Sequence, residues 1–114
     1  MRKNADSERG SVAAELAITL PAVVLALLLG AGALGAAARQ VSLQDAVADA
    51  ARLLGRGESA EIAHAAVTAS VDDARVSSEL RGDLNCVSAR VDVVIGRVIH
   101  IPLTASSCAL SGGL

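Results

Sequence analysis

One long apolar run dominates the pattern of hydrophobic and polar positions along the chain: residues 16–38 contain no ionisable side chain. At about 1.5 Å per residue, a helix of that length reaches roughly 34 Å, slightly more than the ~30 Å hydrocarbon core of a bilayer. The pattern therefore predicts a transmembrane helix. Glu15 stands directly before the run, and Pro21 lies inside it, where its missing amide predicts a kink or local loosening.

Apolar positions at helical spacing continue beyond the run. They are Leu43, Val47, Ala50 and Leu54. Ser11 is a suitable helix N-cap, and Gly55-Arg56-Gly57 offers a glycine suited to the left-handed C-cap. We therefore expect one helix over residues 11–54, apolar in its first half and amphipathic in its second.

A second, alanine-rich helix is expected over about residues 60–71, with Ser59 as its N-cap. Its predicted apolar side consists of Ile62, Ala66 and Val67. His64 has no partner in the pattern and is expected at the surface or at its boundary.

Strict alternation of apolar and polar positions predicts an antiparallel hairpin near the end of the chain. The clearest strand is 86–95, and the last strand covers about 99–110, with Ile95 opposite Ile99. Residues 75–80 form an ambiguous short strand. The predicted fold class is α+β: a long helix, a short helix and a small antiparallel hairpin or three-stranded sheet.

The same register places the two cysteines, Cys86 and Cys108, opposite each other. A bridge between them would close a loop of 23 residues and stabilise the fold by roughly 3 to 4 kcal/mol on the chain-entropy model. Two inert thiols, or a metal site completed by His100, are the alternatives. The register also sets Pro102 against Asp92, which a sheet edge tolerates best.

Composition limits the core and the chemistry. Although 53% of the residues are apolar, there is no Phe, Trp or Tyr, so a small core of Ala, Val, Leu and Ile would gain from a disulfide or from neighbouring subunits. The absence of aromatics and of a basic cluster argues against nucleic-acid binding. No catalytic motif, phosphate loop or metal-ligand motif occurs, so we expect no enzyme activity, no cofactor, no metal and no small-molecule substrate.

Charge suggests an orientation. Three basic residues precede the apolar run, whereas Arg39 and Arg52 follow it closely, which favours a cytoplasmic N-terminus. The predicted organisation is a polar leader over residues 1–10, the long helix over 11–54, and a small exported domain over 55–114.

The N-terminal elements resemble a known export signal. A charged leader ending in Gly10, the junction Gly10-Ser11, and Glu15 as the fifth residue after it are similar to the class III signal of type IV pilins and pseudopilins. The segment RGSVAAE with Leu20-Pro21, together with the ending LTASSCAL, looks like the TadE-like minor pilins of tight-adherence pilus systems, especially the short actinobacterial kind. Leu16 departs from many relatives, which have an aromatic there, and this argues against the major fibre subunit.

This resemblance implies a function. A membrane-embedded prepilin peptidase would remove residues 1–10 and leave Ser11 as the N-terminus, and Glu15 would pair with the terminal amine of a neighbouring subunit. Pro21 would supply helix flexibility on leaving the lipid. The implied partners are the peptidase, other pilin or pseudopilin subunits, the assembly platform and the bilayer; the implied location is the cell membrane, with incorporation into a surface pilus.

Other interpretations of the same residues remain open. Glu15 could simply compensate the dipole at the helix N-terminus. The small residues ending at Ala38 also suit a conventional signal peptide, whose removal would leave a secreted small disulfide domain. An uncleaved single-span membrane anchor is the third alternative.

Overall fold

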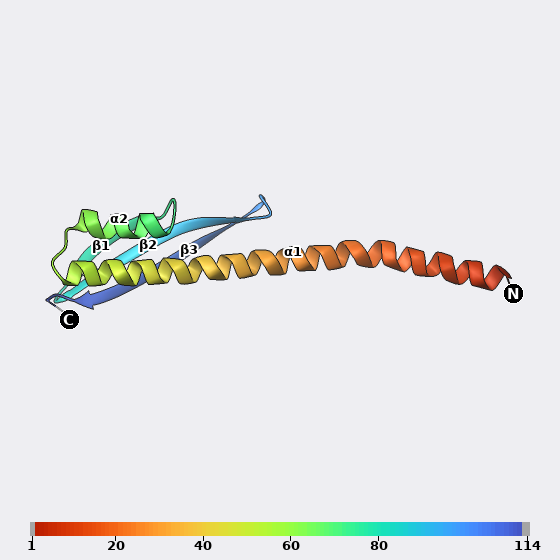
Figure 1. Cartoon of the computed structure of the whole chain (residues 1–114), viewed down its shortest axis with the longest axis horizontal. Helices are drawn as coiled ribbons and strands as arrows, with labels where there is room; N and C mark the ends of the chain where they lie inside the picture. The colour runs from red at the N-terminus through yellow and green to blue at the C-terminus, as the bar shows by residue number, and fades with distance from the viewer. Residues whose placement is uncertain (1, 113–114) are drawn as a thin grey trace.

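The computed structural model of the protein describes residues 2–112, with side-chain exposure from residue 7 onward; residue 1 of the predicted leader and residues 113–114 lie outside the described residues. The elements are α1 (Arg2–Gly55), α2 (Ala60–Ser70), β1 (Arg75–Arg81), β2 (Leu84–Ile95) and β3 (Ile99–Leu110). The α+β class is confirmed. The molecule measures 85 × 23 × 19 Å, because the first half of α1 extends alone while α2 and the sheet gather around its second half (Figure 1).

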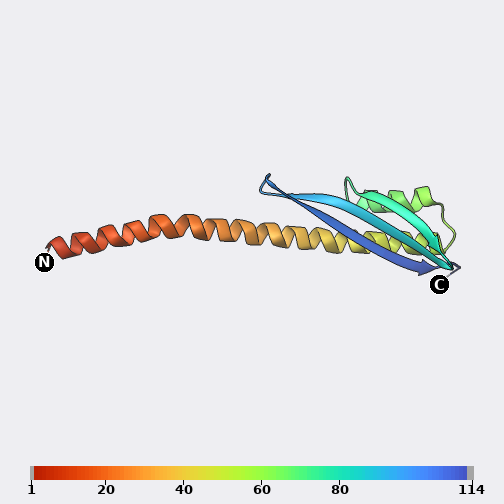
Figure 2. The ribbon, with the colours of Figure 1, turned by 180° about the vertical axis from the view of Figure 1, so that it is seen from behind.

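Helix α1 is longer than the sequence suggested. It begins at Arg2 rather than at Ser11, because residues 2–10 contain no proline and continue the helix without a break. Ser11 is therefore an internal position and caps nothing. Pro21 does not interrupt α1 either. Figures 1 and 2 show instead that the helix bows gently in the part coloured as residues near 20.

The predicted glycine stop at the end of α1 is confirmed. Gly57 has a φ of +93°, the left-handed conformation that favours glycine. The amide of Glu58 donates to the carbonyl of Leu53 at 3.0 Å, which closes the last turn. The chain then reverses and enters α2, where the hydroxyl of Ser59 accepts from a backbone amide at 3.3 Å as the expected N-cap.

The sheet has three antiparallel strands in the order β1-β2-β3. Its register confirms the predicted pairs, with Ile95 opposite Ile99 and Pro102 of the edge strand β3 opposite Asp92. Between β2 and β3 the chain turns through Gly96 and Arg97, which both have positive φ. Two successive residues of this kind define a type I′ turn, whose twist matches that of the flanking strands.

The core lies between one face of the sheet and the two helices, which cover that face side by side (Figure 1). Its buried members are Leu43, Ala46, Val47, Ala50, Ala51, Ala63, Val67, Val71, Val87, Ala89, Val91 and Ala105. All are aliphatic, so each buries little area and the domain depends on many small contacts. The opposite face of the sheet is open to solvent.

Helix α2 corrects two expectations. Val67 is buried as predicted and Ala66 is half-buried, but Ala63 is also buried and Ile62 is 52% exposed. The helix is rotated from the predicted orientation because it packs against both α1 and β1. His64 lies at the boundary as expected but is not without a partner, since its Nε2 lies 3.0 Å from the hydroxyl of Ser78 on β1.

Two glutamines of α1 reach the outer edge of the sheet. The side-chain amide of Gln40 donates to the carbonyl of Thr104 at 2.9 Å, and that of Gln44 donates to the carbonyl of Ser106 at 3.0 Å. Unpaired edge groups are a template for unwanted strand pairing. The long helix therefore blocks part of the β3 edge as well as supplying the core.

Candidate functional site

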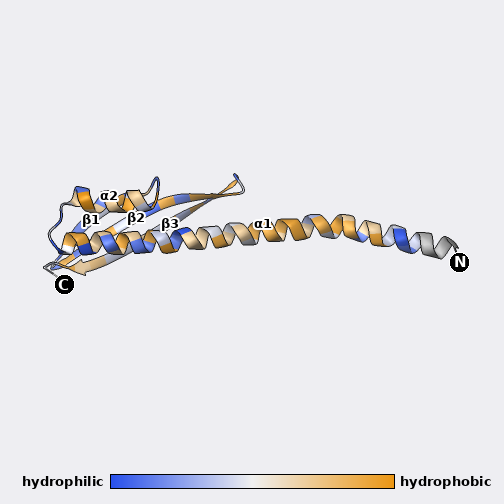
Figure 3. Cartoon of the chain, viewed as in Figure 1, coloured by the Kyte–Doolittle hydropathy of each residue, from blue (hydrophilic) through white to orange (hydrophobic). Residues whose placement is uncertain are grey.

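Residues 16–38 of α1 are apolar and largely uncovered. Among the described residues, one helix, within Ser7–Gly55, is long and apolar enough to cross a membrane, and none of its most apolar window is buried. Figure 3 shows the hydrophobic stretch along the middle of α1, with a hydrophilic segment on its N-terminal side. The large exposed side chains are Leu16, Ile18, Leu20, Val23, Val24, Leu25, Leu27, Leu28, Leu29 and Leu34. Such a surface requires a lipid or protein environment.

Glu15 stands at the N-terminal end of this surface and is exposed. The hydroxyl of Thr19 donates to its backbone carbonyl at 2.6 Å. In the described part of the chain its carboxylate takes part in neither of the two ion pairs, which join Arg52 to Asp49 and Arg81 to Glu79. The negative charge is therefore available for a group outside this chain.

Gly10 and Ser11 lie in the same helix, five and four residues before Glu15. A Cβ atom added to Gly10 would meet nothing within 4 Å, so the junction touches no other element. Glycine also weakens a helix by roughly 1 kcal/mol relative to alanine. The junction is thus exposed, and its glycine weakens the helix locally.

Pro21 lies one and a half turns beyond Glu15. Its ring nitrogen has no hydrogen to donate, so the carbonyl of Ala17 loses its helical partner. Gly10, Ser11, Glu15 and Pro21 all lie on α1. Apart from this shared helix, the fold does not bring them together.

The cysteines form a separate feature at the far end of the molecule. Cys86 and Cys108 are bonded to each other across β2 and β3, which confirms the predicted disulfide. Both sulfur atoms belong to the disulfide, so neither cysteine is a thiolate ligand for a metal. His100 therefore has no cysteine with which to form the alternative metal site. Within residues 7–112, no group of three or more His, Cys, Asp or Glu could hold a metal ion.

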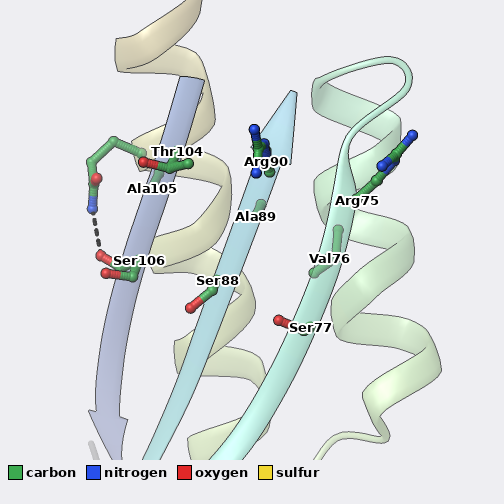
Figure 4. Close-up of a pocket in the computed structure, with 10 residues that line it drawn as sticks. Arg75, Val76, Ser77, Ser88, Ala89, Arg90, Thr104, Ala105 and Ser106 are labelled. Atoms are coloured by element: carbon green, nitrogen blue, oxygen red, sulfur yellow. Dashed lines mark hydrogen bonds between the residues drawn. The ribbon is translucent and has the colours of Figure 1, made fainter. Parts of the chain in front are cut away.

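The exposed face of the sheet carries a shallow depression of about 620 Å³. Figure 4 shows polar side chains in cross-strand rows, although the Arg75 side chain points away from Arg90, and the hydrogen bond from Gln44 to the backbone carbonyl of Ser106 is drawn as a dashed line. The rows are Arg75, Arg90 and Thr104, and Ser77, Ser88 and Ser106. The lining has no acid or histidine to act as a base, so we assign it no chemistry.

Comparison with known proteins connects these features to a family. The TadE-like protein family model matches residues 10–52, from the glycine of the junction to the last turns of α1. The match covers the candidate residues on the helix and confirms the family resemblance over that segment. Comparisons with curated proteins and with solved structures found no match.

Proposed function

Because residues 10–52 match the TadE-like family, we propose that this chain is a minor pilin or pilus-assembly pseudopilin of a tight-adherence, type IV-like pilus. The observation that carries the proposal is an uncovered apolar helix, preceded by Glu15, that continues without a break into a small folded domain. Its role is structural, and the protein acts by assembling with other subunits.

In this proposal α1 crosses the cell membrane with residues 16–38, and its N-terminus is cytoplasmic. Positive charge near a span tends to stay on the cytoplasmic side, and residues 2–9 carry three basic side chains. The disulfide between Cys86 and Cys108 suits an oxidising compartment outside the cytoplasm. Residues 55–114 are therefore assigned to the exported side.

A prepilin peptidase then hydrolyses the bond between Gly10 and Ser11. The hydroxyl of water joins the Gly10 carbonyl carbon and its proton goes to the Ser11 nitrogen. The new carboxylic acid on Gly10 then releases a proton and the new amine on Ser11 takes one up, so that a neutral helical amide becomes a carboxylate and a free ammonium group. This reaction creates a positive charge four residues before Glu15. The exposure of Gly10, which touches no other element, supports access by the peptidase.

Pairing follows from these two charges. A carboxylate at the edge of the hydrocarbon loses part of its hydration, and an opposite charge from an adjacent subunit offsets part of that cost. Glu15 has no ion-pair partner within the described residues of its own chain. We assign it to the ammonium of Ser11 on a neighbouring subunit, which fixes the register of the two helices.

Contacts of the helix support its retention in the mature protein. A conventional signal peptidase cut near Ala38 would remove Gly32, whose Cα lies directly under the side chain of Ile95. It would also remove the apolar surface against which the tip of the hairpin lies. A sheet that extends this far along α1 therefore favours a pilin, which retains the helix, over a secreted domain from which signal peptidase has removed it.

Processing can be tested with two matched glycine variants. We expect the chain produced together with its prepilin peptidase to give a mass corresponding to an N-terminus at Ser11. Gly10→Ala should block the cut, while Gly35→Ala should be processed normally. An added Cβ meets nothing within 4 Å at either position, so the comparison isolates recognition from folding. An intact leader on the parent chain would contradict the proposal.

The pairing role of Glu15 can be tested with a matched loss of charge. Glu15→Gln should lower incorporation into pilus fractions, or co-purification with partner subunits, by roughly tenfold if the pair contributes about 1.4 kcal/mol. Asp45→Asn removes one negative charge from an exposed position on the same helix and should have no effect. Equal incorporation of both variants would show that Glu15 only compensates the helix dipole.

A further inference from the structure

The β2–β3 hairpin extends beyond the rest of the domain toward the N-terminal half of α1. Strand β1 pairs with β2 only up to Arg90, so residues 91–95 and their partners on β3 continue without it. The tip of this hairpin lies beside the middle of α1 (Figure 1). A Cβ atom built on Gly32 would lie 2.6 Å from Cγ2 of Ile95, so the hairpin contacts the proposed membrane span directly.

Hairpin and helix enclose an apolar groove of about 830 Å³. The helix contributes Leu25, Leu28 and Leu29, and the hairpin contributes Val94, Val98 and Ile99. Val98 at the turn is 80% exposed. One wall of the groove therefore belongs to the span itself, and the other belongs to the exported domain.

The height of the tip follows from helix geometry. A hydrocarbon core of ~30 Å takes about 20 helical residues. Counted from Ser11, the core ends near Gly30; counted from Leu16, it ends near Gly35. Gly32, which contacts the hairpin, falls between these limits. The 23-residue apolar run is slightly longer than the core, so its last residues lie among the headgroups, and either placement puts Gly32 within about 5 Å of the boundary between acyl chains and headgroups on the domain side.

The charges around the groove complement that boundary. Arg97 lies in the turn, and Arg39 lines the groove about 10 Å farther along α1 from Gly32. Among the described residues neither arginine forms an ion pair. The nearest acid on β2, Asp92, lies about 13 Å back along the strand from Gly96. Both cations can therefore face lipid phosphates.

Two further facts favour a position of the hairpin tip at the membrane interface. The chain has no Trp or Tyr, the residues that ordinarily anchor a span at the interface. The open edges of β2 and β3 near the tip carry backbone groups that hydrocarbon cannot satisfy, which stops the hairpin from entering more deeply. The tip must remain at the interface, where both aliphatic and polar groups find partners.

From these observations we propose that the β2–β3 tip is a second membrane contact. Val94, Val98 and Ile99 lie among the upper acyl segments of the leaflet on the domain side, and Arg97 and Arg39 bind lipid phosphates. The inference rests on the membrane span of the proposed function, but it does not require a pilus. It makes the domain lie against the bilayer instead of standing clear of it.

Single tryptophans give a direct test, because the chain contains no other aromatic residue. The full chain is placed in phosphatidylcholine vesicles at low protein density, with or without lipids brominated in the upper acyl segments. Val98→Trp reports on the tip, Leu27→Trp on the span, and Leu80→Trp on the distal end of β1. All three positions are at least 65% exposed, so the larger side chain has space.

We expect Val98→Trp and Leu27→Trp to show blue-shifted emission that brominated lipid quenches, and Leu80→Trp to show neither effect. Emission from Val98→Trp that matches Leu80→Trp overturns the membrane contact while leaving the span intact. A blue shift that grows with protein density and resists brominated lipid means that a second copy fills the groove, and this also overturns the proposal. If Leu27→Trp is not quenched, the span itself fails.

The contact of Arg39 and Arg97 with lipid phosphates can be measured separately. Adding phosphatidylglycerol should increase the quenching of Val98→Trp by brominated lipid. The additional substitutions Arg39→Gln and Arg97→Gln should abolish that increase, whereas Arg56→Gln, at the distal end of α1, should retain it. A response to the anionic lipid that survives loss of both arginines overturns the assignment to phosphate.

Discussion

Removal of the disulfide should have a large effect on a domain with such a small aliphatic core. Cys86 and Cys108 are separated by 22 positions, so the bridge closes a loop of 23 residues in the unfolded chain. The chain-entropy expression then gives about 11 cal/mol/K, or about 3.4 kcal/mol at 25 °C. For a domain of this size, that corresponds to a fall in Tm of about 14 to 27 °C.

The assay is thermal unfolding of the full chain in nanodiscs, followed by the loss of β-sheet circular dichroism. The double variant Cys86→Ala and Cys108→Ala is compared with Ser88→Ala and Ser106→Ala, which changes the neighbouring cross-strand pair on the same face. We expect a large fall in Tm for the first pair and a small change for the second. Reduction of the parent should reproduce the cysteine variant.

The reasoning would be refuted if the double cysteine variant unfolded within a few degrees of the parent. That result would mean that the β2–β3 segment already stays together in the unfolded state, so the bridge removes little entropy there. A fall of similar size in the serine variant would also contradict it, because the effect would then belong to the sheet surface.

Three further substitutions test the packing of the domain, each by its thermal unfolding. Leu43→Ala removes the largest fully buried side chain and should cost about 2 to 5 kcal/mol, whereas Val41→Ala, at an exposed position, should cost under about 0.5 kcal/mol. Gly55→Ala places a Cβ 2.7 Å from the carbonyl oxygen of Leu110 and should cost about 1 to 3 kcal/mol; an unchanged Tm would mean that β3 moves freely. Ser59→Ala removes the α2 cap and should cost about 1 kcal/mol.

The strands were more predictable than the ends of the helices. A single turn and a strict alternation determine the β2–β3 register, so the pairing of Cys86 with Cys108 followed from counting outward from Ile95 and Ile99. The start of α1 was not predictable in this way, because Ser11 carries the chemistry of a cap but the residues before it contain no proline that would end the helix there. Capping residues indicate where a helix can begin and not where it must.

Contacts between segments that are distant in the sequence were not predicted, for a different reason. Nothing in the sequence indicates that Ile95 packs on Gly32, that Gln40 donates to β3, or that His64 contacts Ser78. These contacts depend on the angle at which the sheet crosses α1, which is set by the sum of many small aliphatic contacts. The candidate residues on the helix were found from sequence because they lie on one continuous segment, where spacing alone defines their arrangement.

The absence of any linker between span and domain has a mechanical consequence. One helix runs from Arg2 to Gly55, and the sheet packs on its second half. The angle about the helix axis between Glu15 and the open face of the sheet is therefore fixed. One residue inserted after Leu28 would rotate the two by about 100°, and seven would restore their phase to within about 20° while adding roughly 10 Å. A partner that binds at Glu15 therefore also fixes the direction of the sheet about the helix axis, and a partner that binds the sheet fixes the direction of Glu15.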